Sequence, residues 1–338
     1  MNKFKNKTLL ITGGTGSFGN AFLKEALNKK YNFKKLIIYS RDELKQFKMR
    51  ENALFRKNLS KLRFFIGDIR DEKRIKLALN GVDYVIHAAA LKQVPTAEYN
   101  PFEVIKTNII GAQNLINAAL ETNVKKIVAL STDKASSPIN LYGATKLCSD
   151  KLFVSAKSYA GKKNINFSVV RYGNVMGSRG SVIPNFLKDK EKKKLNVTSE
   201  DMTRFNLTLE ESVDLVFWTL KNSFGSDIIV PKIPSYKIME LAKSVCPDCK
   251  IQITGIRPGE KKHEEMISMG ESRNTLELKD KFVILQEKNK SQYNFYKKKF
   301  NVKTSKREFS YNSKENKFFL SSKQLKELIH KQKKNIIV

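Results

Sequence analysis

The first half of the chain alternates short apolar runs with amphipathic segments. The runs are rich in Val, Ile, Leu and Phe, and they cover residues 8–12, 34–39, 61–66, 82–89, 125–131 and 165–172. A strand that is buried on both faces has this nearly continuous apolar pattern, because helices cover both sides of a parallel sheet in α/β proteins. The pattern therefore predicts repeated βαβ units and a doubly wound parallel sheet, which is an α/β fold.

Beyond about residue 176 the alternation loosens. The expected elements are a helix near 181–190, a strand at 195–199, a helix near 208–222, a strand at 227–231, further elements at 234–245 and 250–256, and a glutamate-rich helix after them. The tail from about residue 287 is polar and lysine-rich, and it ends in a helix that Ser321 or Ser322 caps. We predict a large domain over 1–176, to which the chain returns at about 205–232, a smaller lobe over 177–204 and 233–286, and a basic C-terminal segment over 287–338.

The chain is strongly basic, with a formal net charge of +31 and a pI near 9.9. Such a charge often accompanies nucleic-acid binding. Here the lysines are spread along the whole chain, and the local clusters at 188–194 and 296–300 lie in no recognisable nucleic-acid module. A solvated basic surface is therefore favoured over a nucleic-acid site.

Three features of the composition narrow the class of protein further. No segment approaches the ~18 apolar residues of a membrane span. The basic N-terminus leads directly into the first strand, which leaves no room for a signal peptide. Cys246 and Cys249 form one isolated C-x-x-C, so we expect reduced, structural cysteines and no metal site. These features predict a soluble cytoplasmic protein that does not associate with membranes.

The first predicted strand leads into a glycine-rich turn and an amphipathic helix. Gly13, Gly16 and Gly19 fit G-x-x-G-x-x-G, and Gly14 with the last two also fits G-x-G-x-x-G. Glycines at these positions let the backbone approach a pyrophosphate, which the amides of the following helix can bind. Because the turn opens the βαβ series, its context supports dinucleotide binding by the large domain. The other predicted contacts of this turn are Thr15, Ser17 and Phe18.

The residues that end the second predicted strand discriminate between two cofactors. An NAD site generally places an acidic residue there, which binds the ribose hydroxyls. Ser40 and Arg41 instead offer a hydroxyl and a guanidinium suited to a 2′-phosphate, which favours NADP. The alternative is that Asp42 occupies the acidic position and Arg41 is merely exposed. The remaining predicted cofactor contacts are Asp68, Ile69, Ala88, Ala89, Ala90, Lys92, Asn108 and Val175.

The stretch 131–146, STDKASSPINLYGATK, concentrates charged groups after the fifth predicted strand. Tyr142 and Lys146 are four residues apart and can lie on the same side of a helix. A tyrosine with a pKa of about 10 is a poor base at neutral pH, and a nearby ammonium lowers this pKa because it favours the phenolate. Tyr142 can then take a hydroxyl proton while hydride passes to a nicotinamide.

With TGGTGSFG near the N-terminus and Tyr142-Gly-Ala-Thr-Lys146 after the fifth strand, the chain resembles the extended short-chain dehydrogenase/reductases over most of its length. More narrowly, LSTDKASSPINLYGATK resembles the inverting UDP-N-acetylglucosamine 4,6-dehydratases of bacterial surface-sugar pathways, including those that lead to pseudaminic acid. Further matches are ALKQVP, TNIIGAQN, RYGNVMGSRGSVIP, MTRF and GIRPGEKKHEEM. Such relatives are oligomeric, so the resemblance implies a homo-oligomer.

The resemblance implies a role for each group in the stretch. Tyr142, with Thr132 and Lys146, would oxidise C4 of the sugar, and the resulting ketone would acidify the hydrogen at C5. Lys134, as a neutral amine, would remove that hydrogen as a proton, while Asp133, as an acid, would assist loss of the C6 hydroxyl as water. Hydride would then return to C6, so that no net redox occurs. The division of acid and base between Asp133 and Lys134 comes from the resemblance alone.

The substrate contacts are predicted from residue type and loop context. Arginines suit a diphosphate through bidentate hydrogen bonds, and a glutamate can accept hydrogen bonds from ribose hydroxyls. The predicted contacts with a UDP-sugar are Lys92, Asn174, Ser178, Arg179, Gly180, Ser181, Val182, Arg204, Arg257 and Glu260. Two other functions stay open, namely a UDP-sugar 4-epimerase and a non-catalytic protein that senses a dinucleotide or binds nucleic acid on the same scaffold.

Overall fold

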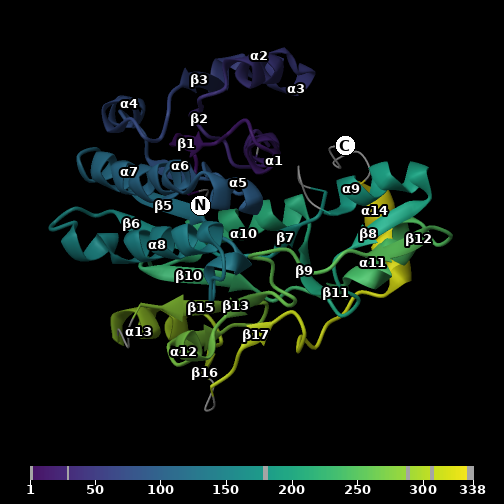
Figure 1. Cartoon of the computed structure of the whole chain (residues 1–338). Coiled ribbons are helices and arrows are strands. Elements are labelled where there is room, and N and C mark those ends of the chain that lie inside the picture. Colours follow the sequence, from purple (N-terminus) through teal and green to yellow (C-terminus); the bar gives the residue numbers. More distant parts are fainter. Residues whose placement is uncertain (1–2, 29, 178–181, 287–289, 305–307, 333–338) are drawn as a thin grey trace.

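The structure is a computed structural model that describes residues 3–28, 30–177, 182–286, 290–304 and 308–332. It consists of a large sheet covered by helices and a smaller lobe at the right of Figure 1. The helices of this lobe are α9 (Val182–Asp189), α11 (Ile238–Val245) and α14 (Ser322–Gln332). Within the described residues, every helix is too short or too polar to cross a membrane.

The large sheet contains six parallel strands that coincide with the six predicted apolar runs. They are β1 (Thr8–Thr12), β2 (Lys35–Ser40), β3 (Leu62–Ile66), β4 (Tyr84–His87), β5 (Lys126–Leu130) and β6 (Asn166–Val170). Their order is β3-β2-β1-β4-β5-β6, and β10 (Asp227–Pro231) extends the sheet in parallel beside β6. The predicted doubly wound α/β fold is therefore confirmed.

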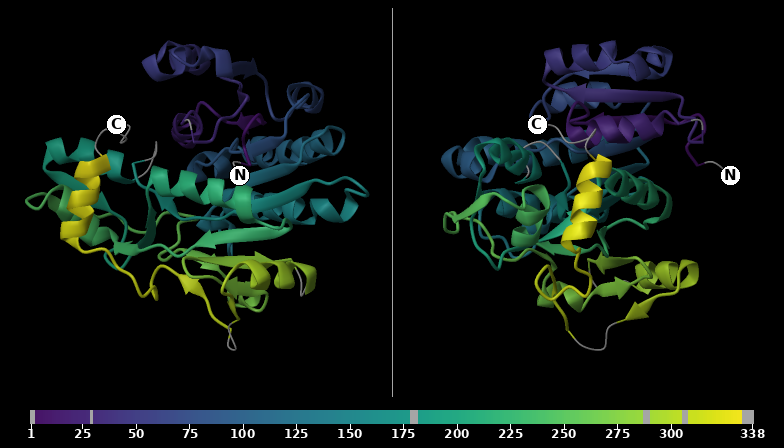
Figure 2. Two further views of the ribbon diagram at one scale, coloured as in Figure 1. Left: turned by 180° about the vertical axis from the view of Figure 1, so that it is seen from behind. Right: turned by 90° about the vertical axis from the view of Figure 1, so that its right-hand side faces the viewer.

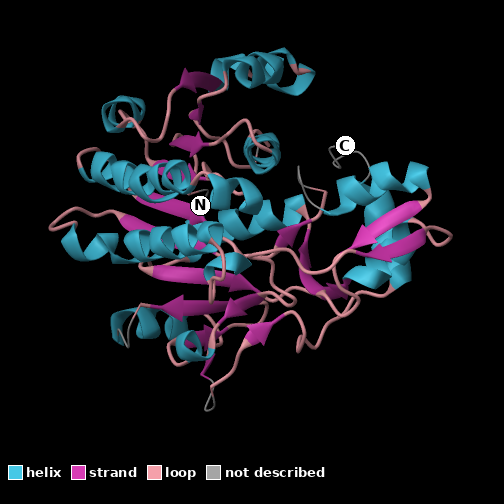
Figure 3. Ribbon diagram, viewed as in Figure 1, coloured by secondary structure: helices cyan, strands magenta, loops and turns pink. Residues whose placement is uncertain are grey.

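Helices cover both faces of the sheet (Figures 2 and 3), which explains the continuous apolar runs. On one face α1 (Ser17–Ala26) packs against α10 (Leu209–Asn222), and on the other α4 (Glu72–Ala78), α7 (Gly111–Leu120) and α8 (Leu141–Ser155) form a row. Shorter helical segments connect these elements: α2 (Glu43–Glu51), α3 (Ala53–Arg56), α5 (Val94–Tyr99), α6 (Pro101–Ile105), the 3-10 turns Leu59–Lys61, Asp133–Ala135, Ala156–Tyr159 and Lys190–Lys192, and the π-helical turn Lys106–Ile110.

One edge of the sheet departs from the prediction. β15 (Lys281–Leu285) pairs antiparallel with β10, and β14 (Thr275–Glu277) and β16 (Lys303–Thr304) follow it, with α13 (Lys290–Lys299) nearby. Residues 275–285 were predicted in the smaller lobe, and this assignment is wrong because they complete the large sheet. All five residues of β15 are buried there, and four of them, Phe282 to Leu285, are apolar.

The smaller lobe has its own hydrophobic core. Phe186, Leu195, Leu241 and Leu325 are among its buried members. β8 (Lys194–Val197) pairs in parallel with β12 (Lys250–Ile253), and α14 packs against α11. The predicted N-cap of α14 is confirmed, because the Ser321 hydroxyl accepts a hydrogen bond from the backbone N–H of Gln324 at 3.3 Å. The C-terminal helix thus completes the smaller lobe.

Two small sheets join the lobe to the large sheet. β9 (Thr203–Leu207) lies between β7 (Asn174–Val175) and β11 (Ser235–Lys237), and β13 (Glu265–Ile267) pairs antiparallel with β17 (Tyr311–Asn312). The predicted glutamate-rich helix is absent, because residues 254–264 form a loop that leads into β13, and only the four-residue α12 (Met269–Ser272) follows. The glutamates in this region bind partners inside the protein, as described below, instead of lining a solvated helix face.

The prediction of reduced cysteines is wrong for the C-x-x-C pair. Cys246 ends α11, and the turn that follows brings the Cα atoms of Cys246 and Cys249 to 5.4 Å, where the two residues form a disulfide. Cα atoms at this separation are within the usual range for such a bond. The pair lies in the core of the smaller lobe, whereas Cys148 is free and exposed on α8.

Candidate active site

A cavity of about 900 Å³ lies at the carboxyl ends of β1, β2, β4, β5 and β6, between the large sheet and the smaller lobe. Ligands of open α/β sheets bind at this edge. The predicted residues that line it are Gly13, Thr15, Gly16, Ser17, Phe18, Gly19, Ser40, Arg41, Ile69, Ala88, Ala89, Ala90, Lys92, Thr132, Lys134, Tyr142, Lys146, Asn174, Val175, Val182, Arg204, Arg257 and Glu260. Predicted residues that do not line it are Asp68, Asn108 and Asp133, and Ser178, Arg179, Gly180 and Ser181 lie outside the described residues.

The glycine turn after β1 brings backbone close to backbone. Gly13 has a φ of +67°, and a Cβ there would lie 2.9 Å from the carbonyl carbon of Ala88 in the segment after β4. A Cβ on Gly19 would lie 2.3 Å from the carbonyl oxygen of Gly14. Glycine is therefore required at both positions for the turn to pack against its neighbours. Gly16 is the N-cap of α1 and has no side chain to bind the first amides of that helix, which begins at the cavity.

The residues after β2 that the two alternatives name both lie at the cavity. The Asp42 carboxylate caps α2, accepting hydrogen bonds from the backbone N–H of Lys45 at 2.9 Å and from its Nζ at 2.5 Å. Ser40 Oγ lies 2.9 Å from Thr15 Oγ1, and Arg41 lies at the cavity with its Nη1 3.4 Å from Asp68 Oδ2. Asp42 thus caps α2, and it also lines the cavity together with Ser40 and Arg41.

Tyr142 and Lys146 lie one turn apart near the start of α8, which Asn140 caps by accepting a hydrogen bond from the backbone N–H of Gly143 at 2.8 Å. Burial raises the pKa of Tyr142 to about 12, against the positive charge of Lys134 and a hydrogen bond with Thr132, which lower it. The sequence analysis assigned this lowering to Lys146. The charge that lowers the pKa of Tyr142 most is instead that of Lys134. Lys146 is buried, and desolvation lowers its own pKa.

A buried network of ion pairs anchors α8 through Asp150. The guanidinium of Arg171, which is 0% exposed, lies 3.2 Å from Asp150 Oδ2 on α8 and 2.9 Å from Glu271 Oε1 on α12. The Ser131 hydroxyl also donates to Asp150 Oδ2 at 2.8 Å. Asp150 follows Lys146 by one helical turn, so the network fixes the orientation of the helix that carries Tyr142 and Lys146.

The turn Asp133–Ala135 packs tightly on the start of α8. A Cβ on Gly143 would lie 2.2 Å from the carbonyl oxygen of Lys134, so this close approach requires glycine between Tyr142 and Lys146. Thr132 precedes the turn and caps it, accepting a hydrogen bond from the backbone N–H of Lys134 at 3.4 Å. The crowded stretch of the sequence is therefore one compact unit at the cavity.

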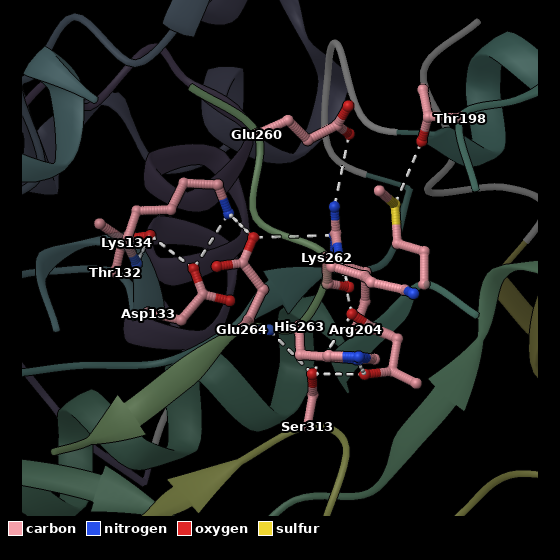
Figure 4. Close-up of polar contacts among 12 residues, drawn as sticks. Thr132, Asp133, Lys134, Thr198, Arg204, Glu260, Lys262, His263, Glu264 and Ser313 are labelled. Carbon is pink, nitrogen blue, oxygen red and sulfur yellow. Dashed lines mark hydrogen bonds and ion pairs between the residues drawn. The ribbon is translucent and has the colours of Figure 1, made fainter. Parts of the chain in front are cut away.

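Lys134 lies between two buried carboxylates (Figure 4). Its Nζ is 3.1 Å from Asp133 Oδ1 and 2.8 Å from Glu264 Oε1, and the two carboxylate side chains are 1% and 2% exposed. Burial opposes the charge on Lys134, but these carboxylates outweigh it and raise the lysine pKa. The ammonium is therefore the favoured form of Lys134 in this arrangement, and the neutral amine that the resemblance implies for the reaction requires loss of a proton.

Glu264 is the residue of the site that the sequence analysis missed. It lines the cavity from the loop before β13. Burial favours the neutral acid, but Lys134 and Arg204 outweigh burial and lower the pKa of Glu264. The pKa of Asp133 is raised by its burial and by the charge of Glu264. The two carboxyl groups thus differ in proton affinity, and Asp133 is the one that retains a proton more readily.

Arg204 and Glu260 meet at the same edge of the cavity. The Arg204 guanidinium donates to the carbonyl oxygens of Thr203 at 2.8 Å and Lys262 at 3.1 Å, and it lies 3.4 Å from Glu260 Oε1 and 3.7 Å from Glu264 Oε1. This anchoring leaves the residue 5% exposed. Arg204 thus already pairs with two carboxylates, Glu260 and Glu264. Its contact with a diphosphate stays a prediction.

Asp68 and Asn108, which do not line the cavity, have hydrogen-bond and ion-pair partners within the protein. Asp68 accepts a hydrogen bond from the backbone N–H of Arg70 and pairs with Arg41 and Arg70. Asn108, in the π-helical turn, exchanges hydrogen bonds with both backbone groups of Leu91 at 2.9 Å and donates to Thr145 Oγ1 at 3.0 Å. Asn108 therefore fixes the segment that follows β4 against α8.

Both the dinucleotide-type turn and the Tyr142–Lys146 pair face one cavity of a doubly wound sheet, and this combination defines an extended short-chain dehydrogenase/reductase. Comparison with known families agrees with this class. A family described as polysaccharide biosynthesis protein matches residues 9–286, and the chain belongs to that family.

Relatives with different names are similar to this chain in sequence, and one solved structure is similar in fold. An inverting UDP-N-acetylglucosamine 4,6-dehydratase of Campylobacter jejuni subsp. jejuni serotype O:23/36 (strain 81-176) is 54% identical over 283 residues, covering 83% of each chain. A UDP-glucose 4-epimerase of Rickettsia conorii is 46% identical over 288 residues, again covering 83% of each chain. The solved structure of Pen from Bacillus thuringiensis is 38% identical, with a TM-score of 0.88 and coverage of 98% of this chain and 99% of that chain.

Proposed function

We propose that this chain is an inverting UDP-N-acetylglucosamine 4,6-dehydratase that uses NADP+. The observation that carries the proposal is the group of Asp133, Lys134 and Glu264 beside the Tyr142–Lys146 pair. Loss of water from a sugar needs an acid and a base in addition to hydride transfer, whereas a 4-epimerase needs no such group. The 54% identity to a protein named as an inverting dehydratase supports the same reaction.

The residues around the cavity fit a nicotinamide dinucleotide. Gly13 and Gly19 let the turn after β1 pack closely against Ala88 and Gly14, α1 begins at the cavity where its first amides can bind a pyrophosphate, and Ser40 and Arg41 suit a 2′-phosphate. When bound, a nicotinamide dinucleotide would supply the acceptor for hydride from C4 of the sugar and the donor of hydride to C6. Ser40 and Arg41 are the support for NADP rather than NAD.

The side chains would divide the proton transfers among them. Tyr142 takes the proton of the C4 hydroxyl as the ketone forms, and Lys134 receives the acidified C5 proton. Asp133 supplies the proton for the departing C6 hydroxyl. Because Asp133 does not line the cavity, its proton reaches the sugar through Thr132, whose hydroxyl lies 3.0 Å from Asp133 Oδ1, or through Lys134. C5 is finally reprotonated on the opposite face.

Arg257 and Glu260 lie in the loop after β12 and would bind the nucleotide part of a UDP-sugar, together with Asn174, Val182 and Arg204.

A homo-oligomer and cytoplasmic placement are further parts of the proposal, drawn from the resemblance to the dehydratases. Light scattering coupled to size-exclusion chromatography measures the first, with a mass of one chain as the contradicting result.

The test is an NMR assay with UDP-N-acetylglucosamine and NADP+ in deuterated water. The proposal predicts a C6 methyl signal and deuterium at C5, with coupling constants that report the inverted C5 configuration. A 4-epimerase, the activity named for the Rickettsia relative, would instead change the configuration at C4 without a methyl group. A dinucleotide-sensing protein would give no turnover. Lys134→Ala should abolish dehydration, and an unchanged rate would remove its proposed role.

A further inference from the structure

The contact between Lys134 and Glu264 raises a question about proton transfer that bears on the proposed dehydratase reaction and rests on it. An ammonium has no lone pair, so Lys134 must lose a proton before it can accept one from C5. Its Nζ contacts two carboxylates, Asp133 Oδ1 at 3.1 Å and Glu264 Oε1 at 2.8 Å. These two carboxylates are the candidate acceptors of the lysine proton that Nζ contacts directly.

The two carboxyl groups are not equivalent acceptors. Asp133 is fully buried beside Glu264, and both its burial and the charge of Glu264 favour its protonated form. A protonated Asp133 can serve the departing hydroxyl but cannot take a proton from Lys134. Glu264 remains ionised because Lys134 and Arg204 lie close to it, at 2.8 Å and 3.7 Å. Its Oε2 is buried and, like Asp133 Oδ2, has no hydrogen-bond partner among the described residues, so either group can hold a proton without breaking an existing bond. Glu264 makes the shorter contact with Lys134 Nζ, at 2.8 Å against 3.1 Å, and it lines the cavity whereas Asp133 does not.

We propose that Glu264 is the proton acceptor of Lys134, taking one proton from the ammonium and leaving the neutral amine that removes the C5 proton. An N–H bond of Lys134 breaks and an O–H bond of Glu264 forms. The C5–H bond then breaks as a new N–H bond forms, and its electron pair stays on the sugar as the enolate. That pair expels the C6 hydroxyl, which leaves as water with the proton of Asp133. Glu264 acts through Lys134 and is in this sense a positioning residue.

The C-terminal segment holds Glu264 in place (Figure 4). Ser313 follows β17; its backbone N–H donates to the Glu264 carbonyl at 2.7 Å, and its hydroxyl accepts from the Glu264 N–H at 2.9 Å. The same hydroxyl lies 2.7 Å from Thr203 Oγ1 on β9. Both backbone groups of Glu264 are therefore fixed by a segment far along the chain, which leaves its carboxylate directed at Lys134.

The test separates oxidation at C4 from proton removal at C5. The 6-deoxy analogue of UDP-N-acetylglucosamine has no C6 hydroxyl to lose, so its oxidation accumulates reduced nicotinamide, and NMR in deuterated water reports exchange at C5. Glu264→Gln keeps an oxygen acceptor for Lys134 but cannot take its proton. We expect C5 exchange to fall at least about 100-fold, with C4 oxidation within about threefold of the parent protein. Asp201→Asn, which removes an exposed carboxylate paired with Lys262, is the control and should alter neither rate.

A second variant keeps the test decisive if the first does not fold. Glu264→Asp retains a carboxylate, but its shorter side chain places that carboxylate farther from Lys134. C5 exchange should therefore fall by about 3- to 30-fold, a smaller loss than that expected for Glu264→Gln. Exchange within about threefold of the parent in Glu264→Gln, or equal losses in both variants, would overturn the proposal. Faster C5 exchange by Glu264→Gln at neutral pH, with the pH profile of exchange moved to lower pH, would also overturn the proposal. That result would mean that Glu264 only stabilises the ammonium of Lys134. If the parent protein itself fails to exchange C5, the proposed function is at fault instead.

Discussion

The Nζ of Lys134 lies 2.8 Å from the Oε1 of Glu264, although 130 positions separate the two residues in the chain. Lys134 follows β5 of the large sheet, and Glu264 precedes β13, which β17 of the C-terminal segment holds in place. The acid–base group is therefore assembled from segments far apart in sequence. Its geometry depends on how closely the turn Asp133–Ala135, the start of α8 and this loop approach one another.

Gly143→Ala tests that close approach. The added Cβ would lie 2.2 Å from the carbonyl oxygen of Lys134, so the turn must move away from α8. We expect the free energy of unfolding to fall by about 1–3 kcal/mol, despite the better helix propensity of alanine. Gly270→Ala on α12 is the control, because nothing lies within 4 Å of its added Cβ. Urea denaturation measures the free energy of unfolding of both variants. Equal values would show that the turn Asp133–Ala135 does not pack tightly against the start of α8.

Arg41→Ala tests the choice of cofactor. If the Arg41 guanidinium binds a 2′-phosphate, its loss removes a charge-assisted hydrogen bond, and affinity for NADP+ should fall by about 10- to 100-fold. Affinity for NAD+ should stay within about threefold. Isothermal titration calorimetry measures both, with Arg50→Ala on the exposed side of α2 as the control. A parent protein that binds NAD+ more tightly than NADP+ would contradict the assignment.

Asp150→Asn tests the buried network behind α8. The change leaves the Arg171 guanidinium, which is 0% exposed, without a charged partner on that helix. Removing one member of a buried ion pair costs about 3–5 kcal/mol, so the unfolding free energy should fall by that order. Glu308→Gln removes a partner of Arg273 at the surface, where the 2.7 Å pair is exposed, and should cost less than about 1 kcal/mol. Similar losses in the two variants would argue against the network as a support of the site.

His87 should make stability depend on pH. Its Nδ1 lies 2.9 Å from Thr12 Oγ1 inside the sheet, and burial lowers its pKa to about 3. As the pH falls, His87 therefore binds a proton in the unfolded chain at a higher pH than in the folded protein. The stability that the neutral form contributes is complete above about pH 6.5 and is lost toward pH 3, with a slope of up to about 1.4 kcal/mol per pH unit.

Unfolding titrations at several pH values between neutral and mildly acid conditions measure this slope. His87→Gln should flatten it, whereas His330→Gln, at an exposed position on α14, should leave it as in the parent. A slope that is the same in parent and His87→Gln would mean that His87 is not the group responsible.

Much of the fold could be predicted because its strands carry a local signal. The runs over β1, β2, β4, β5 and β6 are buried along most of their length, and β3, at the edge of the sheet, is buried only in part, so an apolar signal is visible in each run by itself. The run of β15 is equally apolar, but a strand pattern does not specify which sheet the strand joins, and residues 275–285 were therefore misplaced. The disulfide of Cys246 and Cys249 was missed because two cysteines alone do not reveal their redox state.

The candidate site could be predicted where chemistry lies close together in the chain. Tyr142, Lys146, Asp133 and Lys134 fall within one stretch, and its context indicated a site. Glu264 gave no such signal, because the segment GEKKHEEM reads locally as a solvated helix. The match of GIRPGEKKHEEM to the dehydratases did draw attention to the segment, but only tertiary packing makes one of its glutamates a buried partner of Lys134. The same packing places the Lys134 ammonium between two carboxylates, which no local pattern in the sequence indicates.

Hydride migration within the sugar tests the central claim most directly. UDP-N-acetylglucosamine labelled with deuterium at C4 is incubated with the protein and NADP+, and the product is analysed by NMR and mass spectrometry. Transient oxidation at C4 predicts that the label moves to C6 as a CH2D group, without net reduction of the cofactor. Deuterium that remains at C4, or an unlabelled methyl group at C6, would contradict the account.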